Sequence, residues 1–550
     1  MKNKFIAGII IGVLATVTFG FVEYQNIYFK INKNMDIFGR VYKEIVSNYV
    51  DEVDPEKFMR SGIDGMLETL DPYTVFIGEK EGDDLDLITH GQYGGIGVSI
   101  GVRDGSIIVV APMEGYSAQK QGVRAGDRLI EIDGEKISSS NPDSVRSKVR
   151  GEPGTTVRIK IEREGEAQPL EFVLVREEIQ INNVTYSGYV KEGIGYIKLE
   201  RFSRRAGDEV RQAIKELKAS GELKGIILDL RDNPGGLLEA AVEIVSKFVP
   251  NGSTVVTTRG RKDDEKIYSA NEEPLVSDIP LAVLINKNSA SASEIVAGAV
   301  QDLDRGILIG TRSFGKGLVQ TILPLSYNTS MKITTARYYT PSGRSIQEID
   351  YLHKNKDGVF LTTPDSLKHE YKTSRGRIVK DFGGVMPDSI VLEHERSTFY
   401  QELMRKAMFF KFATRYVTKH PPLQEKKNVA VDEPLIKEFE EYVQTQKFEY
   451  RDDVEKKLAE VKESLTKEHY SSAALESIDA LNVQLNKEKI NGITRHENEI
   501  REELEEELNA RYSGEKGRIK TSLQFDTQVQ TATGLLLNKK EYEKKLKLKK

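Results

Sequence analysis

The chain has 550 residues and a formal net charge of −5, from 80 Lys and Arg against 85 Asp and Glu. This near balance argues against a protein whose main task is to coat nucleic acid or an anionic membrane. The length suggests several domains, and 38% hydrophobic residues can fill their cores. Because the sequence contains no cysteine, disulfides, thiolate metal sites and cysteine nucleophiles are excluded.

At the N-terminus, an uncharged run from Phe5 to Val22 follows Lys2 and Lys4 and ends at Glu23. The run is long enough for a short membrane-spanning helix and longer than a usual signal-peptide core. We therefore expect residues 1–23 to form an uncleaved signal anchor; a cleaved signal peptide and a buried soluble helix are the alternatives. The lysines ahead of the run predict that the rest of the chain lies outside the cytoplasm.

The next two segments differ in their periodicity. Residues 35–90 place apolar side chains such as Ile37, Val41 and Ile45 at helical spacing, which predicts a small N-terminal helical segment. Residues 91–180 instead show alternating apolar strands separated by glycine turns. This pattern predicts a compact β-rich module with one or two helices.

Residues 183–395 alternate between strand and helix patterns. Gly225–Leu230 and Leu281–Ile285 are continuous apolar runs, as in buried strands. Helices are expected between them, so this region predicts an α/β layer. Residues 398–550 have helical spacing and many charges, which is typical of solvated helices or of an interaction or oligomerisation region.

A serine cluster, Asn288–Glu294, lies where the strand ending at Ile285 should turn into a helix. A serine there has its hydroxyl exposed at the edge of the sheet, beside helix N–H groups that stabilise negative charge. Plain helix capping is the alternative, because Ser is a favoured N-cap and Glu294 could complete a capping box.

A serine nucleophile needs a base, and none of the seven histidines lies in residues 183–340. That absence argues against a Ser-His-Asp arrangement. A lysine can act instead if desolvation lowers its pKa enough to make it neutral. Lys316 lies between two glycines beside an apolar strand, and Gln320 would share its face of that strand. Gln320 could hold the amine without adding charge.

The same lysine has two other interpretations. Gly310–Lys316 fits the phosphate-loop spacing G-x-x-x-x-G-K. However, Gly317 stands where Ser or Thr should hold magnesium, and a strand pattern follows where a helix is required. Nucleotide binding is therefore disfavoured, whereas a surface lysine in a glycine hairpin stays open as an interpretation.

A third element is the segment Leu228–Gly236 at the end of a buried strand. Its paired glycines, Gly235 and Gly236, allow main-chain N–H groups to approach a ligand closely. Together with the N–H of Ala292 they could form an oxyanion hole. The alternative is an ordinary turn between a strand and a helix.

These three elements, in this order, resemble the C-terminal processing peptidases, also called tail-specific proteases. The family pattern is a serine in S-A-S-A-S-E, a lysine in F-G-K-G and a glutamine four residues further on. The resemblance covers about residues 35–395 and assigns the nucleophile to Ser291, the base to Lys316 and the third position to Gln320.

The resemblance also implies that residues 91–180 form a PDZ domain. Gly95, Ile96, Gly97 and Val98 look like its carboxylate-binding loop, in which successive N–H groups receive the C-terminal carboxylate of a peptide. The peptide would add as a strand to the edge of the sheet. An ordinary glycine-containing strand is the alternative.

The predicted fold is multidomain: an N-terminal membrane anchor, a helical segment, a PDZ domain, an α/β serine protease core and a C-terminal helical extension. The predicted function is a bacterial serine endopeptidase acting outside the cytoplasm, in the periplasm or at the outer face of the inner membrane. It would recruit protein or peptide C-termini through the PDZ domain and use a Ser-Lys acyl-enzyme mechanism.

The predicted partners and alternatives complete this hypothesis. The resemblance implies no metal, organic cofactor or nucleic acid. The protein would contact the membrane through its anchor and form homo-oligomers or bind an adaptor through residues 398–550. The competing hypothesis is a catalytically inactive, membrane-tethered scaffold that binds peptides.

Overall fold

The computed structural model describes residues 27–79, 91–137, 141–261, 264–354, 359–420, 428–450, 453–489 and 492–547. The predicted signal anchor or signal peptide, residues 1–23, lies outside these ranges. Within them, no helix combines the length and the apolar character needed to cross a membrane. The chain divides into two units, residues 1–79 with 320–334 and residues 80–319 with 335–550.

The smaller unit combines helices with part of a β-sheet. Residues 27–48 are helical, and α2 (Pro55–Leu67) begins where the Asp54 carboxylate accepts two N–H groups of the first turn. β1 (Val75–Ile77) pairs antiparallel with the start of β18 (Ser330–Tyr339). The N-terminal segment therefore contributes a strand besides the predicted helices.

The β-rich module contains a six-stranded antiparallel sheet in the order β3-β4-β5-β7-β8, with β6 beside β5. Its strands are β3 (Val98–Arg103), β4 (Ser106–Pro112), β5 (Arg128–Ile132), β6 (Glu135–Lys136), β7 (Thr156–Glu162) and β8 (Leu170–Val175). α4 (Ser117–Lys120) and α5 (Pro142–Val149) contact it, and β2 (Gln92–Gly95) pairs with β9 (Glu177–Gln180). β3 is an edge strand of this sheet, so a further strand could pair with it.

A second six-stranded sheet, the core sheet, has the order β10-β11-β12-β15-β16-β23. Its strands are β10 (Val184–Lys191), β11 (Ile194–Leu199), β12 (Gly225–Asp229), β15 (Leu281–Ile285), β16 (Ile307–Gly310) and β23 (Ser389–Ile390). Only β10 and β11 pair antiparallel in this sheet; the other pairs are parallel. Because β11, β12, β15 and β16 are added in one direction, right-handed crossovers place their connecting helices on one face. These helices are α6 (Ala206–Ser220), α7 (Leu238–Ser246) and α8 (Ala292–Asp302).

Side chains of the core sheet alternate between two apolar clusters. Leu228, Val283 and Leu308 pack with α6, α7 and α8. Ile227 and Leu284, one position along the strands, point to the opposite face and belong to a second cluster. Both faces are buried, which explains the continuous apolar runs of the sequence. The prediction of an α/β layer is confirmed.

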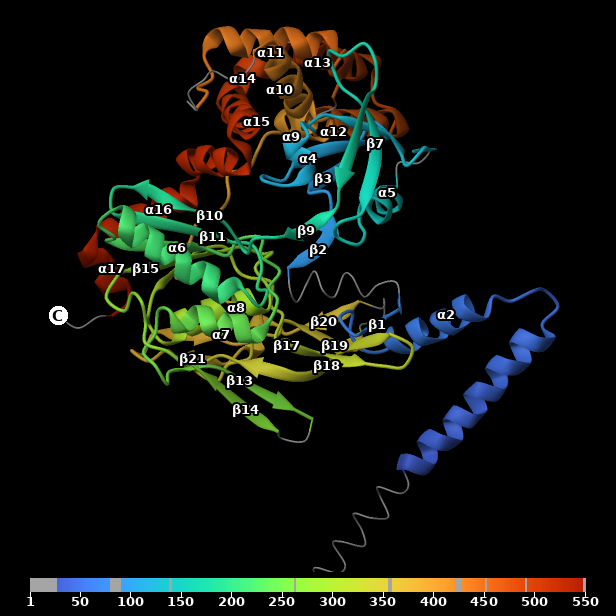
Figure 1. Ribbon diagram of the computed structural model, residues 1–550. Helices are drawn as coiled ribbons and strands as arrows, with labels where there is room; N and C mark the ends of the chain where they lie inside the picture. Colours follow the sequence, from blue (N-terminus) through green and yellow to red (C-terminus); the bar gives the residue numbers. More distant parts are fainter. Residues whose placement is uncertain are drawn as a thin grey trace, which may run out of the picture. The chain divides into compact units, whose positions relative to one another are not determined.

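The opposite face of the core sheet is covered by the C-terminal helices. These are α15 (Glu497–Phe525), α16 (Thr527–Leu537) and α17 (Lys539–Lys545), shown in red in Figure 1. They contribute Leu523, Ala532 and Leu536, and the Tyr542 hydroxyl bonds to both main-chain groups of Leu281 at 2.9 and 3.1 Å. The sequence analysis did not predict that this part of the C-terminal region covers the core sheet; a charged helix can bury one apolar stripe while its other face stays solvated.

The first part of the C-terminal region forms a bundle with its own aromatic core. Its helices are α9 (Thr398–Arg405), α10 (Met408–Lys419), α11 (Glu433–Thr445), α14 (Gly492–Arg495) and the start of α15. Phe409 stacks on Phe439 with ring centroids 5.1 Å apart, and Phe412 meets Phe439 edge-on at 5.2 Å. α15 leaves the bundle at a kink at Gly514, whose φ is +67°.

Two other features connect or extend this bundle. α10 contacts the β-rich module, where Phe410 packs against Ile108 and Lys411 pairs with Asp104 at 2.6 Å. α12 (Asp453–Lys467) and α13 (Ser472–Lys489) pack on each other as a hairpin. None of the side chains that the structure describes in this hairpin is buried.

Candidate active site

The turn after β15 places Ser291 directly before α8. Its φ and ψ are +56° and −113°, a strained conformation for a residue with a side chain. Such a sharp turn from strand to helix presents a serine hydroxyl outward at the edge of the sheet. Ser291 is half-buried, whereas every residue of α8 is buried. Glu294 forms a capping box with Ser291. The main-chain N–H of Glu294 also donates to the Ser291 carbonyl at 2.8 Å. The start of α8 is therefore not capped by the Ser291 hydroxyl alone.

The two neighbouring serines are buried and their hydroxyls bind main-chain groups. Ser289 Oγ donates to the Leu230 carbonyl at 2.8 Å, and Ser293 Oγ donates to the Asn233 carbonyl at 2.9 Å. Both side chains are fully buried. They fasten the turn after β12 to the turn after β15 and leave Ser291 as the accessible hydroxyl of the cluster.

Glu294 brings the candidate nucleophile and base together. One carboxylate oxygen, Oε2, accepts the N–H of Ser291 at 2.9 Å and the N–H of Lys316 at 2.8 Å. The other oxygen accepts the Ser313 hydroxyl at 2.6 Å and the N–H of Gly315 at 2.7 Å. Glu294 is fully buried, and this burial raises its pKa to about 7 although the four hydrogen bonds lower it. The sequence predicted only a capping role for this residue.

Tyr338 makes a second connection between the same two segments. Its buried hydroxyl contacts the Ser291 carbonyl at 3.0 Å and the Lys316 carbonyl. The Phe314 N–H also donates to the Ser289 carbonyl at 3.0 Å. The main chains at Ser291 and Lys316 are therefore adjacent and held by several groups.

Lys316 and Gln320 do not share a strand. β17 (Leu318–Pro324) begins two residues after Lys316, so the prediction that alternation places both side chains on one face of a strand is wrong. Gln320 lies within β17, where its amide donates to Thr334 Oγ1 at 3.4 Å. The strand candidate of the sequence already began at Leu318, after the glycines around Lys316; only its extension back to Lys316 was not met.

The turn after β12 lies against Ser291. Gly235 has a φ of +98°, and a Cβ on it would lie 2.9 Å from the Ser291 Cβ and 2.6 Å from the Ala290 carbonyl oxygen. Gly236 has a φ of +152°, and a Cβ there would lie 2.3 Å from the Phe202 carbonyl oxygen. Only glycine fits these positions.

The predicted oxyanion donors differ in availability. The Gly235 N–H already donates to Asn233 Oδ1 at 2.9 Å. The N–H groups of Gly236 and Ala292 make no hydrogen bond within the described part of the chain. Of the two predicted glycines, Gly236 therefore has the N–H that is available beside that of Ala292.

Comparison with known proteins identifies the region that carries these turns. Residues 193–352 match the model of peptidase family S41. The carboxy-terminal-processing protease of Bartonella bacilliformis is 40% identical over 329 residues, which are 59% of this chain and 74% of that protein. The chain belongs to the carboxy-terminal-processing protease family. This membership confirms the predicted family and supports a serine-type peptidase.

Further matches cover other parts of the chain. Residues 108–163 match a PDZ domain, 399–536 a "probable PDZ-protease, C-terminal helical domain" and 20–81 an "activating protease CtpB N-terminal domain". CtpB of Bacillus subtilis is 34% identical over 58% of this chain and 66% of its own length. The solved photosystem II D1 C-terminal processing protease is 30% identical, covers 60% of this chain and 91% of its own, and has a TM-score of 0.34.

The predicted carboxylate-binding loop of the PDZ domain joins β2 to the edge strand β3. Gly95 ends β2, Ile96 is buried and Val98 begins β3. Gly97 has a φ of +74°, and a Cβ on it would lie 2.5 Å from the Tyr116 Cβ. α5 contacts β3. A peptide added to β3 would thus lie next to α5, with its terminus at this loop.

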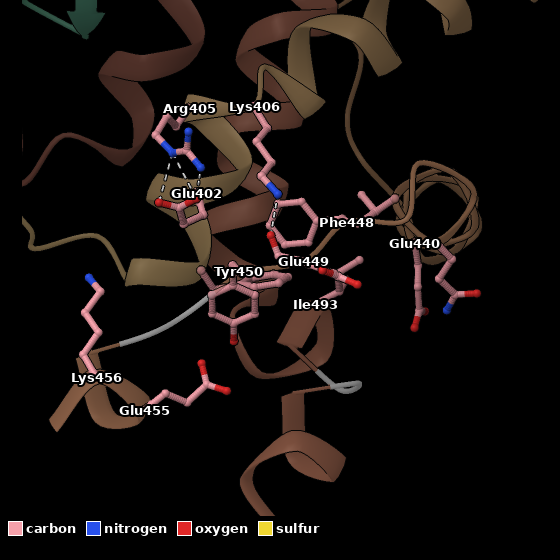
Figure 2. A pocket seen from close by; sticks show the side chains of 13 residues that line it. Glu402, Arg405, Lys406, Glu440, Phe448, Glu449, Tyr450, Glu455, Lys456 and Ile493 are labelled. Atoms are coloured by element: carbon pink, nitrogen blue, oxygen red, sulfur yellow. Dashed lines mark hydrogen bonds and ion pairs between the residues drawn. The ribbon is translucent and has the colours of Figure 1, made fainter. Parts of the chain in front are cut away.

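One cavity lies away from these residues, in the helical bundle. It has a volume of about 1070 Å³. Figure 2 shows aromatic side chains, including Phe448 and Tyr450, with charged groups such as Arg405 and Lys406 around them. No candidate catalytic or peptide-binding residue lines it. In the described ranges, no cluster of His, Asp and Glu has the arrangement of a metal site.

Proposed function

We propose that the protein is a serine endopeptidase that cleaves proteins outside the cytoplasm and recruits their C-termini through its PDZ domain. The observation that carries this proposal is the Glu294 carboxylate, whose Oε2 accepts the N–H groups of both Ser291 and Lys316. A serine on a strained turn next to a lysine segment is the arrangement that a Ser-Lys hydrolase requires.

The chemical steps follow from these residues. Neutral Lys316 removes the proton from Ser291 Oγ, and the oxygen attacks the peptide carbonyl. The N–H groups of Gly236 and Ala292 stabilise the oxyanion. The lysine then gives its proton to the leaving amine, and water releases the acyl group. Gln320 has the proposed role of orienting the lysine amine.

Substrate capture and location form the other half of the proposal. The free edge of β3 and the Gly97 turn support binding of a peptide C-terminus in the PDZ domain. Residues 1–23 would hold the enzyme in the membrane with the catalytic part outside the cytoplasm, as the lysines before the apolar run suggest. An oligomer or adaptor contact would use the exposed part of the helical region.

The test is cleavage of an unstructured protein by wild type, Ser291→Ala and Lys316→Ala. We expect both variants to lose turnover at least about 1000-fold while their thermal unfolding stays near that of wild type. Wild-type activity should rise with pH as Lys316 loses its proton. Normal cleavage by Ser291→Ala would refute the proposal, and peptide binding without cleavage by the wild type would favour the scaffold hypothesis.

A further inference from the structure

Arg231, the first residue of the turn that leads to Gly236, is held by carboxylates from two distant parts of the chain. Asp229, at the end of β12, contacts its guanidinium through both oxygens at 2.5 to 3.0 Å. Asp526, between α15 and α16, lies 2.7 Å from the same guanidinium. Only 13% of the Arg231 side chain is exposed, and Asp229 is fully buried. Charges buried to this degree hold a defined geometry only when they are paired.

Asp526 serves two groups at once. Its Oδ1 accepts the N–H groups of Gln528 at 2.9 Å and Val529 at 3.0 Å, which makes it the N-cap of α16. Its Oδ2 faces Arg231. Gln528 adds a further contact, since its Oε1 accepts from Arg231 at 3.0 Å. The start of α16 is thereby attached to the turn after β12.

The segment from Arg231 to Gly236 is bonded at successive residues, so a displacement of Arg231 reaches the glycines. The Asp232 N–H donates to Asn286 Oδ1 at 3.0 Å. Asn233 Nδ2 donates to the Leu199 carbonyl at 2.8 Å, and its Oδ1 accepts the N–H of Gly235. The proposed donor Gly236 comes directly afterwards. Misplacing an oxyanion donor by a fraction of an ångström reduces the stabilisation of the transition state more than that of the ground state.

We infer that Asp526 is a positioning residue for peptide hydrolysis: through Arg231, the C-terminal helical region sets the place of the oxyanion turn. This inference rests on the proposed function. It gives the helical region a catalytic task in addition to covering the core sheet. Asp526 does not touch the substrate, and Asp229 still neutralises Arg231 when Asp526 is absent, so the protein can fold without it.

The test separates the two interactions of Asp526, the cap of α16 and the ion pair with Arg231. Asp526→Asn keeps a side-chain oxygen for the helix cap but removes the charge that faces Arg231. Asp432, the N-cap of α11, gives the matched control because it accepts the Leu435 N–H at 3.1 Å and belongs to the separate helical bundle. We expect Asp526→Asn to lower kcat about tenfold with KM within about twofold. Asp432→Asn should leave both constants unchanged, and Asp526→Glu should recover part of the lost kcat.

A double-mutant cycle with Arg231→Lys shows whether the effect passes through Arg231. Lysine keeps the charge beside Asp229 but cannot contact both partners with a planar fork. Adding Asp526→Asn to Arg231→Lys should then lower kcat by less than about twofold. A wild-type kcat for Asp526→Asn, or the full tenfold loss on the Arg231→Lys background, would overturn the inference. If Ser291→Ala were active, the proposed function itself would fail, which is a separate outcome.

Discussion

The turns after β12 and β15 meet at the same edge of the core sheet but are held in different ways. The turn after β15 is fixed by nearby groups, since Glu294 lies three residues from Ser291 and its other partners belong to Ser313–Lys316. The turn after β12 is fixed in part by Asp526, from the distant helical region. The contacts of the turn after β15 therefore lie within the S41 match, whereas the turn after β12 also contacts a residue outside it.

Apart from the variants of Ser291 and Lys316, the largest expected effect comes from filling the turn after β12. Gly236→Ala puts a methyl group 2.3 Å from the Phe202 carbonyl oxygen at a φ of +152°, so the turn must move. We expect kcat to fall at least about 100-fold, as for the loss of an oxyanion donor. Gly252→Ala is the control, because Gly252 also has a positive φ but nothing lies within 4 Å of its Cβ. It should cost about 1 kcal/mol of stability and leave kcat unchanged.

The turn after β15 is tested by pH. The pKa of Glu294 is raised from 4.5 to about 7, so the folded protein binds this proton more tightly than the unfolded chain. The resulting stabilisation is present below pH 4.5 and is lost as pH rises to 7, by up to about 3 kcal/mol. Urea unfolding of wild type and Glu294→Gln at pH 5, 6 and 7 measures how the free energy of unfolding changes with pH. It should decrease less for the variant as pH rises. Equal slopes would show that Glu294 does not titrate in this range.

The bonds between the two turns give a smaller effect. Ser289→Ala and Ser293→Ala each remove a buried hydroxyl that donates to a carbonyl of the other turn. We expect each to lower the free energy of unfolding by about 1 kcal/mol, because a buried hydrogen bond is lost while each carbonyl keeps a main-chain N–H partner. Their kcat should fall less than that of Gly236→Ala. A complete loss of activity in either variant would mean that the nucleophile had been assigned to the wrong serine.

The smallest effect is expected from the outer part of the helical region. Replacing residues 453–489, the α12–α13 hairpin, with a short Gly-Ser linker removes no described side chain that is buried. The melting temperature should change by less than about 2 °C. Peptide cleavage by the variant without the hairpin should have a kcat within about twofold of the wild-type value. A large loss of kcat would show that the whole helical region, and not only Asp526, supports the turn.

The sequence predicted much of the fold from the apolar runs at Gly225–Leu230 and Leu281–Ile285. A strand that is apolar throughout must be buried on both faces. The sequence could not tell that β11, β12, β15 and β16 follow one another in one direction, which puts α6, α7 and α8 on a single face. For that reason the sequence did not reveal that α15 to α17 cover the second face, and residues 398–550 were interpreted only as solvated helices or an interaction region.

The site shows a similar limit. Ser291 and Lys316 could be proposed from the sequence because their motifs are local and ordered along the chain. Glu294 was visible only as a helix cap, because its burial and its bond to Lys316 depend on tertiary contacts. Asp526 is the N-cap of α16, a common role for Asp. The neighbouring sequence does not indicate that its second oxygen contacts Arg231, which lies far away along the chain.

The packing of α16 and α17 on the core sheet has a consequence for biosynthesis. When residues up to β23 have left the ribosome, one face of the sheet, with Ile227, Leu284 and Ile309, still lacks its helices. The nascent chain must therefore emerge through Leu546, the last residue of this cluster, before the layer can close. Asp526 reaches Arg231 only once this segment has also been made, so translation order places the closing of the core sheet after the synthesis of α15 to α17.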